Sequence, residues 1–497
     1  MNKLPRHAET VVVGGGTAGA TLGGTLAARS DETVLVLEAG PDYGPFDRTA
    51  WPADLLDSRA LPSTHQWGFD SGSTYGDRVV PFERARVIGG CSSHNGCAAI
   101  VGSRLDYDGW EASGCAGWGT EELRPLFAEA VDRLRVRNYR DDEMTPFHRA
   151  CLEAAPHAGL PRVGDLNDWD ENQGIALFPI NVVDGVRWNA AFAYLDPVRS
   201  RETLSILGDA LVSRIVLSGD RVTGVEVIRV GRAELVECDR VVLAAGTFGS
   251  PVILQRSGIG DPARLHALGI ESVHALRGVG QNLHDHPAVT VRFVGGAGSA
   301  ETMQAFAATR WMPEEQSIAK LRSSYCNEGF DLHTYPIGGP TPDGGWKWEL
   351  PVACMTPISR GEVHIAGSDP DTLPVIDHRF ASDPDGRDRR VLADGIRLMR
   401  ELAATEPLRS FVGAELDAAA ADELIDERLT HYFHPVGSCK MGPNSDPDAV
   451  VDPECRIHGL ENAFVADCSI CPTIPRANTN LPAAVIGLRA AHLLSRR

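Results

Sequence analysis

Residues 9–40 read "ETVVVGGGTAGATLGGTLAARSDETVLVLEAG", and this stretch decides the fold class. Two short apolar runs, residues 11–13 and 34–38, flank a glycine turn and a segment with helical character. Continuous apolar runs of this length are typical of strands that a parallel sheet buries on both faces. The stretch therefore predicts a strand–helix–strand unit and places the chain in the α/β class.

The glycine turn carries a dinucleotide-binding pattern. Gly14, Gly16 and Gly19 form G-x-G-x-x-G between the first strand and the helix. The first glycine permits the tight turn, the second lets a pyrophosphate approach the backbone, and the third lets helix and strand pack. Glu38 ends the next strand, where it can accept hydrogen bonds from a ribose. The pattern predicts a dinucleotide site but does not separate NAD from FAD, and a turn shaped by packing alone is the alternative.

The bulk properties exclude several partners. The 497 residues carry a formal net charge of −20. Nucleic acid and anionic membranes would repel such a chain, so we expect neither as a partner. No apolar run approaches the roughly 18 residues of a membrane helix, and "MNKLPRHAET" contains no apolar leader. The eleven cysteines are odd in number, which excludes a complete disulfide framework and favours a cytoplasmic protein.

Dinucleotide-type elements recur far apart in the chain. A strand, turn and helix are predicted again over residues 240–260, and a strand, loop and helix close the chain. Residues 41–110, rich in Gly, Pro, Asp and Ser, predict long loops. We therefore expect one domain built from separated segments, with a second domain inserted. The predicted cofactor domain comprises 1–150, 191–285 and 432–497, and the predicted substrate domain comprises 151–190 and 286–431.

Longer motifs further along the chain distinguish FAD from NAD as the predicted cofactor. They are "RARVIGGCSSHNG", "GTFGSPVILQRSGIG", "VGQNLHDHP", "HYFHPVGSCKMG", "VVDPECRIHGLENAFVADCSICP" and "NTNLPAAVIG". With the glycine motif, they resemble the glucose–methanol–choline (GMC) family of FAD-dependent oxidoreductases over essentially the whole chain. The resemblance implies an interrupted, Rossmann-like FAD domain of the p-hydroxybenzoate-hydroxylase type and an α+β substrate domain on an antiparallel sheet. It also implies oxidation of an alcohol.

The resemblance assigns cofactor contacts position by position. The glycine motif and Glu38 would hold the ADP part of FAD, Val212 its adenine end, and Asp467 its ribityl and pyrophosphate region. A second group would line the isoalloxazine ring. The implied cofactor residues are Gly14, Gly16, Thr17, Ala18, Gly19, Glu38, Gly90, Ser93, His94, Asn95, Gly96, Val212, Asp467, Asn478 and Thr479, and no metal is expected.

The resemblance also implies the catalytic residues. His434 in "FHPVG" falls on the catalytic histidine, and Asn478 in "NTN" falls on its partner position. A histidine near neutral pKa can take the hydroxyl proton while hydride leaves the carbon for flavin N5. The Asn478 amide would then steady the alkoxide-like oxygen. His333 in "FDLHTYPIG" is a further candidate for this oxygen, against the alternative of a core histidine, and His286 is expected to be structural.

His94 lies in a loop of otherwise small residues, "GGCSSHNG". The loop is most similar to the choline oxidase branch of the family, in which this histidine is bonded to the 8α-methyl group of the flavin. We therefore expect His94 to tether FAD covalently. The alternative is a histidine that only stacks or hydrogen-bonds beside the ring.

Three positions depart from the choline oxidase pattern. Ala288, in "HDHPAV", replaces the carboxylate that pairs with a quaternary ammonium, while Gly96 replaces a serine and Phe433 a tyrosine. A cation without that carboxylate loses its main electrostatic partner. We expect an uncharged primary or secondary alcohol: an aromatic alcohol, a polyol or a glycoside. Trp67 is a candidate for the wall of its cavity.

The sequence leaves the reoxidising partner open. Oxygen or another electron acceptor, as in a dehydrogenase, could take the electrons. A hydroxynitrile lyase, which keeps FAD without redox work, is the alternative from another reaction class. A homodimer is expected from the resemblance alone.

Overall fold

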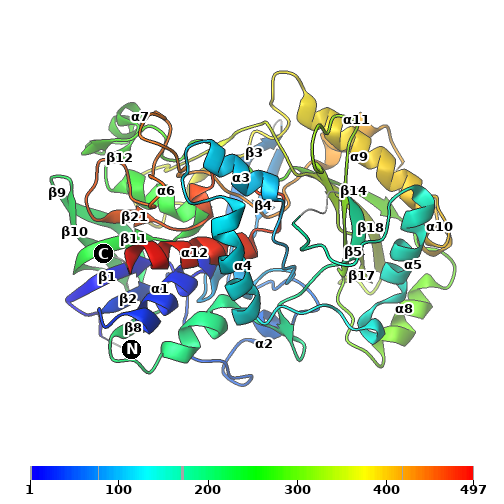
Figure 1. The fold of residues 1–497 in the computed structure, drawn as a ribbon, viewed down its shortest axis with the longest axis horizontal. Helices are drawn as coiled ribbons and strands as arrows, with labels where there is room; N and C mark the ends of the chain where they lie inside the picture. The colour runs from blue at the N-terminus through cyan, green and yellow to red at the C-terminus, as the bar shows by residue number, and fades with distance from the viewer. Residues whose placement is uncertain (1–2, 76–77, 170–172, 417, 496–497) are drawn as a thin grey trace.

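The computed structural model describes residues 3–75, 78–169, 173–416 and 418–495. Two sheets lie toward opposite ends of the long axis, and both chain termini lie beside the first sheet (Figure 1). The two largest hydrophobic clusters follow this division, one around each sheet. No helix within the described ranges is both long enough and apolar enough to cross a membrane.

The first sheet confirms the predicted strand–helix–strand unit. Its strand order is β8-β2-β1-β11-β10-β9, and β21 also pairs with β11. The pairs β8–β2, β2–β1, β1–β11 and β11–β21 are parallel, whereas β9, β10 and β11 form an antiparallel meander. The strands are β1 (His7–Val13), β2 (Val34–Leu37), β8 (Leu204–Leu207), β9 (Leu211–Ser218), β10 (Arg221–Arg229), β11 (Arg232–Leu243) and β21 (Ala463–Val465).

The parallel strands bring distant motifs to one edge. The carboxyl ends of parallel strands share one edge of a sheet, and ligands of open α/β sheets bind there. Gly14 follows β1, Glu38 follows β2 and Asp467 follows β21. Helix α1 (Thr17–Arg29) starts at this edge and packs on α12 (Asn480–Leu494) from the end of the chain. The edge therefore combines segments hundreds of residues apart.

The second sheet is antiparallel, as expected for the substrate domain. Its order is β14-β18-β16-β15-β5, with β17 also paired to β18. Helices α9 and α11 lie alongside it (Figure 1). Its elements are β5 (Gly174–Leu177), β14 (Ala288–Phe293), β15 (Ser317–Leu321), β16 (Leu332–Thr334), β17 (Ile337–Pro340), β18 (Trp346–Cys354), α5 (Pro146–Ala154), α8 (Ser299–Ala307), α9 (Arg387–Ala403), α10 (Leu408–Val412) and α11 (Ala421–Arg428).

A third sheet joins the two predicted domains and corrects the expectation of loops over 41–110. Its order is β19-β20-β3-β4, so strands from the first 150 residues pair with strands from 286–431. Composition concealed β3 and β4 because Gly, Ser and Pro interrupt them. The domain boundaries stay a prediction. These strands are β3 (Phe69–Tyr75), β4 (Arg78–Phe82), β19 (Glu362–His364) and β20 (Val375–Asp377).

Short elements complete the chain around these sheets. Helix α4 packs against α12, and each of the eleven cysteines is a free thiol. The remaining α-helices and strands are α2 (Ala53–Leu56), α3 (Arg104–Ala112), α4 (Thr120–Arg133), α6 (Gly246–Arg256), α7 (Pro262–Ala267), β6 (Val182–Val183), β7 (Val186–Arg187), β12 (Ile259–Gly260) and β13 (His274–Ala275).

Candidate active site

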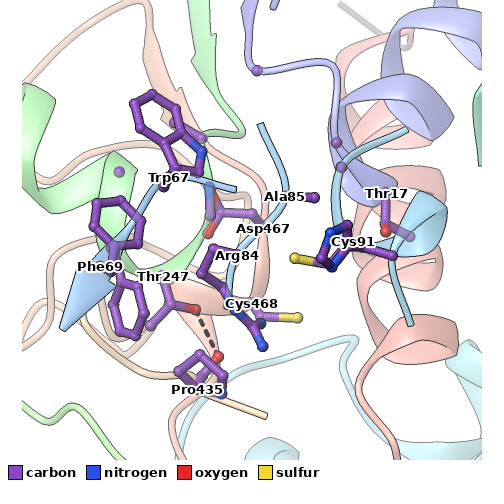
Figure 2. Close-up of a pocket in the computed structure, with 18 of the residues that line it drawn as sticks. Thr17, Trp67, Phe69, Arg84, Ala85, Cys91, Thr247, Pro435, Asp467 and Cys468 are labelled. Carbon is purple, nitrogen blue, oxygen red and sulfur yellow. Dashed lines mark hydrogen bonds between the residues drawn. The ribbon is translucent and has the colours of Figure 1, made fainter. Parts of the chain in front are cut away.

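One cavity of about 530 Å³ extends from the glycine turn to His434. Its walls come from the parallel edge of the first sheet, from the flavin loop predicted around His94 and from segments near the second sheet. In Figure 2, Thr17 and Cys91 lie on one side, Trp67 and Phe69 on the other, and Arg84 and Asp467 between them. The volume is within the range of small-molecule and cofactor sites.

Most of the predicted cofactor residues lie on the wall. The lining includes Gly14, Gly16, Thr17, Ala18, Glu38, Gly90, His94, Asn95, Gly96, Val212, Asp467, Asn478 and Thr479. Gly19 lies behind it, where a Cβ would come within 1.9 Å of the Gly14 carbonyl oxygen. That contact is the helix–strand packing predicted for the third glycine. Ser93 also lies behind the wall and donates to the Ile88 carbonyl at 2.9 Å.

The start of α1 offers an anion site. Gly16 is its N-cap residue and has no side chain to satisfy the amides of the first turn. Those amides and the helix dipole favour a phosphate at this position. Gly90, at φ +53°, packs backbone to backbone on this turn, and a Cβ on it would lie 2.6 Å from the Gly16 Cα. The residues present therefore fit a pyrophosphate.

The carboxylate of Glu38 is held at the sheet edge. It accepts hydrogen bonds from the amides of Gly15, at 2.9 Å, and Gly40, at 2.8 Å. Burial raises the pKa of Glu38 to about 7, against the lowering effect of these two amides. Each carboxylate oxygen can accept a further bond, so Glu38 fits a ribose hydroxyl pair.

Asp467 lies in the centre of the cavity view (Figure 2). It accepts hydrogen bonds from the Gly246 amide at 2.9 Å, from the Ser250 hydroxyl at 2.5 Å and from the Ser469 amide at 2.8 Å. Burial raises its pKa, and these bonds lower it. Because several donors fix the carboxylate, Asp467 is a rigid part of the wall at the strand edge.

His94 is positioned by its loop. Its Nε2 atom lies 2.8 Å from the carbonyl oxygen of Thr64. A carbonyl only accepts, so Nε2 carries the proton and Nδ1 is the nitrogen left for a ligand. Burial lowers the pKa of His94, which keeps the ring neutral. A neutral imidazole on the cavity wall fits both the predicted tether and the alternative of a contact beside the flavin.

His434 and Asn478 meet at the other end of the cavity. The Asn478 amide nitrogen lies 3.4 Å from His434 Nε2. His434 Nδ1 lies 3.1 Å from Nδ1 of His286. A donor from Asn478 leaves His434 Nε2 unprotonated, so its Nδ1 donates to His286. Burial, and then the neighbouring His286 and Arg84, hold the pKa of His434 well below its usual range. His434 is therefore a neutral imidazole whose Nε2 can accept a proton.

Asp285 fixes the backbone of this pair. Its carboxylate accepts from the His434 amide at 2.9 and 3.0 Å and from the His286 amide at 2.7 Å. Potential ligand atoms of these three residues lie within 4.8 Å of one another. The Asp285 oxygens already accept backbone amides, and His434 faces His286 through a hydrogen bond. The cluster thus orients the His434 ring, and His286 forms a hydrogen bond with its Nδ1.

His333 does not line the cavity. It is fully buried in β16, stacks on Phe330 with ring centroids 5.3 Å apart, and has no hydrogen-bond partner at either nitrogen among the described residues. Burial lowers its pKa well below the usual range. Tyr335, two residues along, reaches the wall instead. The substrate-oxygen role of His333 stays a prediction, and the geometry favours the core alternative.

Sequence reasoning missed three residues at the substrate end. Asp285 is hidden in "HDHP", where its role depends on a chain segment 149 residues away. Tyr432 and Glu315 line the cavity, but no motif surrounds Glu315 in "PEEQS". Two adjacent glutamates before a fully buried strand were the only available signal, and burial of one acid cannot be read from them.

The fold and this cavity define a flavin-dependent oxidoreductase. The N-terminal domain of the GMC oxidoreductases matches residues 8–288, and the C-terminal domain of the same family matches residues 357–487. The chain belongs to the GMC oxidoreductase family. It is accordingly an FAD-containing alcohol oxidase or dehydrogenase, as the sequence motifs implied.

Individual relatives cover the whole chain. Choline oxidase from Arthrobacter globiformis is 33% identical over 99% of this chain and 95% of that enzyme. An oxygen-dependent choline dehydrogenase from Vibrio vulnificus is 31% identical over the same shares. Among solved structures, pyridoxine 4-oxidase from Mesorbium loti superposes with a TM-score of 0.87 at 28% identity, over 99% of this chain and 100% of that chain.

Proposed function

We propose that this protein oxidises a small alcohol to its carbonyl compound with His434 as the base and Asn478 as the donor to the reacting oxygen. One observation carries the proposal: the glycine turn and the His434–Asn478 pair line the same cavity. Bound FAD would supply the hydride acceptor. Glu38, the start of α1, Gly90 and Asp467 would hold it along the wall.

The geometry supports a proton path through the chain's own residues. An alcohol oxygen placed between Asn478 and His434 can accept a hydrogen bond from the amide and donate one to Nε2. His434 Nε2 then takes the hydroxyl proton as negative charge develops on the oxygen. The Asn478 amide stabilises that charge. Asp285 and His286 keep the imidazole oriented during the transfer.

The position of Glu315 widens the class of alcohol that was predicted from the sequence. An uncharged alcohol was expected because Ala288 replaces a carboxylate. Glu315, from another segment, places a carboxylate on the cavity wall. The proposal therefore covers primary and secondary alcohols, with oxygen or another acceptor reoxidising the flavin.

Anaerobic mixing of the purified yellow protein with a panel of alcohols tests this function. We expect the flavin absorbance to bleach with at least one alcohol, because hydride reaches the bound FAD. A hydroxynitrile lyase would leave the flavin oxidised with every alcohol and would release cyanide from a cyanohydrin. That pair of results would overturn the proposal.

A further inference from the structure

Glu315 is an acid on the cavity wall. It lies between α8 and β15, and its side chain is only partly exposed. Within the described part of the chain, no side chain or amide forms a hydrogen bond or ion pair with its carboxylate. Its backbone carbonyl, by contrast, accepts a bond from the Tyr139 hydroxyl at 3.2 Å.

The neighbouring acid, Glu314, forms an ion pair instead. Glu314 pairs with Lys347 at 2.7 Å and does not line the cavity. That ion pair occupies the nearest cation and leaves Glu315 to face the cavity. The pKa of Glu315 is raised to about 7, chiefly by burial and then by the charges of Glu314 and Glu349, against the lowering effect of Lys347. A partly buried carboxylate in this state lacks a compensating positive charge.

Aromatic and small residues surround this carboxylate. Tyr335 and Tyr432 both line the cavity and stack with ring centroids 4.1 Å apart at 12°. Burial raises the pKa of both phenols well above the usual range, and the charge of Glu315, which lines the same cavity, raises it further. A Cβ on Gly96 would lie 3.5 Å from Glu315 Oε2, so the missing side chain keeps this side open.

The base lies close to the same rings. The ring centroids of Tyr432 and His434 are 4.4 Å apart. A substrate whose hydroxyl reaches His434 can therefore extend along the tyrosine pair toward Glu315. Its far end would exclude water from a carboxylate that no protein donor satisfies.

We propose that Glu315, with the rings of Tyr335 and Tyr432, binds a protonated amine on the alcohol substrate. This proposal rests on the proposed function and narrows its substrate to amino alcohols. The carboxylate supplies charge and acceptors, and the tyrosine rings supply a cation–π surface. An N–H is required because a desolvated carboxylate needs donors, and a quaternary ammonium has none.

Two alcohols of matched shape test the substrate class. The charged probe is para-(aminomethyl)benzyl alcohol, and its neutral counterpart is para-ethylbenzyl alcohol. The measured quantity is the rate constant of anaerobic flavin reduction divided by the dissociation constant of the alcohol. In the wild-type holoprotein, we expect this ratio to be about tenfold or more higher for the charged alcohol. Glu315→Gln, which keeps the side-chain shape, should abolish that preference. Glu301→Gln, a control at an exposed glutamate of α8 that does not line the cavity, should leave the preference unchanged.

Calorimetry separates binding from the reaction. Benzylamine should bind the wild-type holoprotein about tenfold more tightly than it binds Glu315→Gln, and more tightly than benzyltrimethylammonium does. Binding near about pH 7 should release up to about half a proton, because the cation lowers the pKa of Glu315. Heats measured in two buffers of different ionisation enthalpy detect that release, which Glu315→Gln should lose.

The outcomes distinguish the two proposals. If no alcohol of the panel, these two included, reduces the flavin but benzylamine binding depends on Glu315, the oxidation is wrong and the amine site stands. If both alcohols reduce the flavin equally and Glu315→Gln changes neither reduction nor benzylamine binding, the amine site is wrong and the oxidation stands. Thermal melting of both variants should match the wild type, which checks that the substitutions preserve the fold.

Discussion

The two ends of the cavity are built from different materials. At the predicted cofactor end, Gly14, Gly16 and Gly90 leave backbone exposed where FAD is expected, and the N-terminus of α1 offers a charge complement to its phosphates. At the substrate end, side chains such as His434 and Glu315 line the wall. Backbone atoms can hold a cofactor that a whole family has in common, whereas the choice of substrate depends on side-chain chemistry. The first end is therefore the more predictable from sequence.

Adding a Cβ to Gly90 in the loop around His94 should abolish FAD binding. In Gly90→Ala, the new atom would lie 2.6 Å from the Gly16 Cα at a φ of +53°, so the anion-binding turn must move. We expect the purified variant to lose its flavin absorbance. Gly159→Ala is the matched control, because Gly159 is also at positive φ with open space around it. A Gly90→Ala protein with full flavin content would contradict the predicted pyrophosphate site.

His94 tests how firmly the cofactor end holds FAD. We expect acid precipitation of the wild-type protein to leave the flavin in the pellet, and peptide mapping to place it on His94. In His94→Ala the flavin should move to the supernatant while the native protein stays yellow, because the other contacts remain. Wild-type flavin in the supernatant would reduce His94 to a neighbour of the ring.

Asn478 tests the substrate end with FAD in place. Its amide is the donor nearest to His434 Nε2, at 3.4 Å. Removing one donor to a developing oxyanion costs about 100-fold or more in rate. We expect Asn478→Ala to slow anaerobic flavin reduction by about that factor, with unchanged flavin content. A rate within about twofold of the wild type would remove Asn478 from the reaction.

Glu38 should make cofactor affinity depend on pH. Its pKa of about 7 means that the carboxylate is mostly protonated at about pH 6 and mostly ionised at about pH 8. Only the ionised form accepts hydrogen bonds at all its oxygens from ribose hydroxyls. FAD affinity of the apoprotein, prepared from His94→Ala, should therefore rise about tenfold over this range. Glu38→Gln should flatten the profile, and a falling profile in the parent would refute this role.

The elements that form the cofactor end could be predicted from the sequence because their determinants are local. The glycine motif and Glu38 lie within one strand–helix–strand unit, and β1, α1 and β2 form it as expected. The longer motifs, through resemblance, also predicted that His434 and Asn478 would meet. Spacing within a motif is enough when the backbone itself makes the site.

The substrate end was less predictable because its charges depend on tertiary packing. His333 was expected near the reacting oxygen, but it is buried within β16, whereas Tyr335, just past the end of that strand, lines the cavity. The partnerless state of Glu315 depends on Lys347 pairing with Glu314 instead. The strands β3 and β4 were likewise missed, because their pairing with β20 is a contact between distant segments.

The most direct test of the central claim is anaerobic flavin reduction in His434→Ala beside the wild-type protein. The account predicts equal flavin content, because His434 lies at the substrate end. It also predicts reduction by the alcohol slowed by about three orders of magnitude or more, because no neutral imidazole takes the hydroxyl proton. Reduction at close to the wild-type rate, with flavin still bound, would contradict the assignment of His434 and with it the chemistry proposed for this cavity.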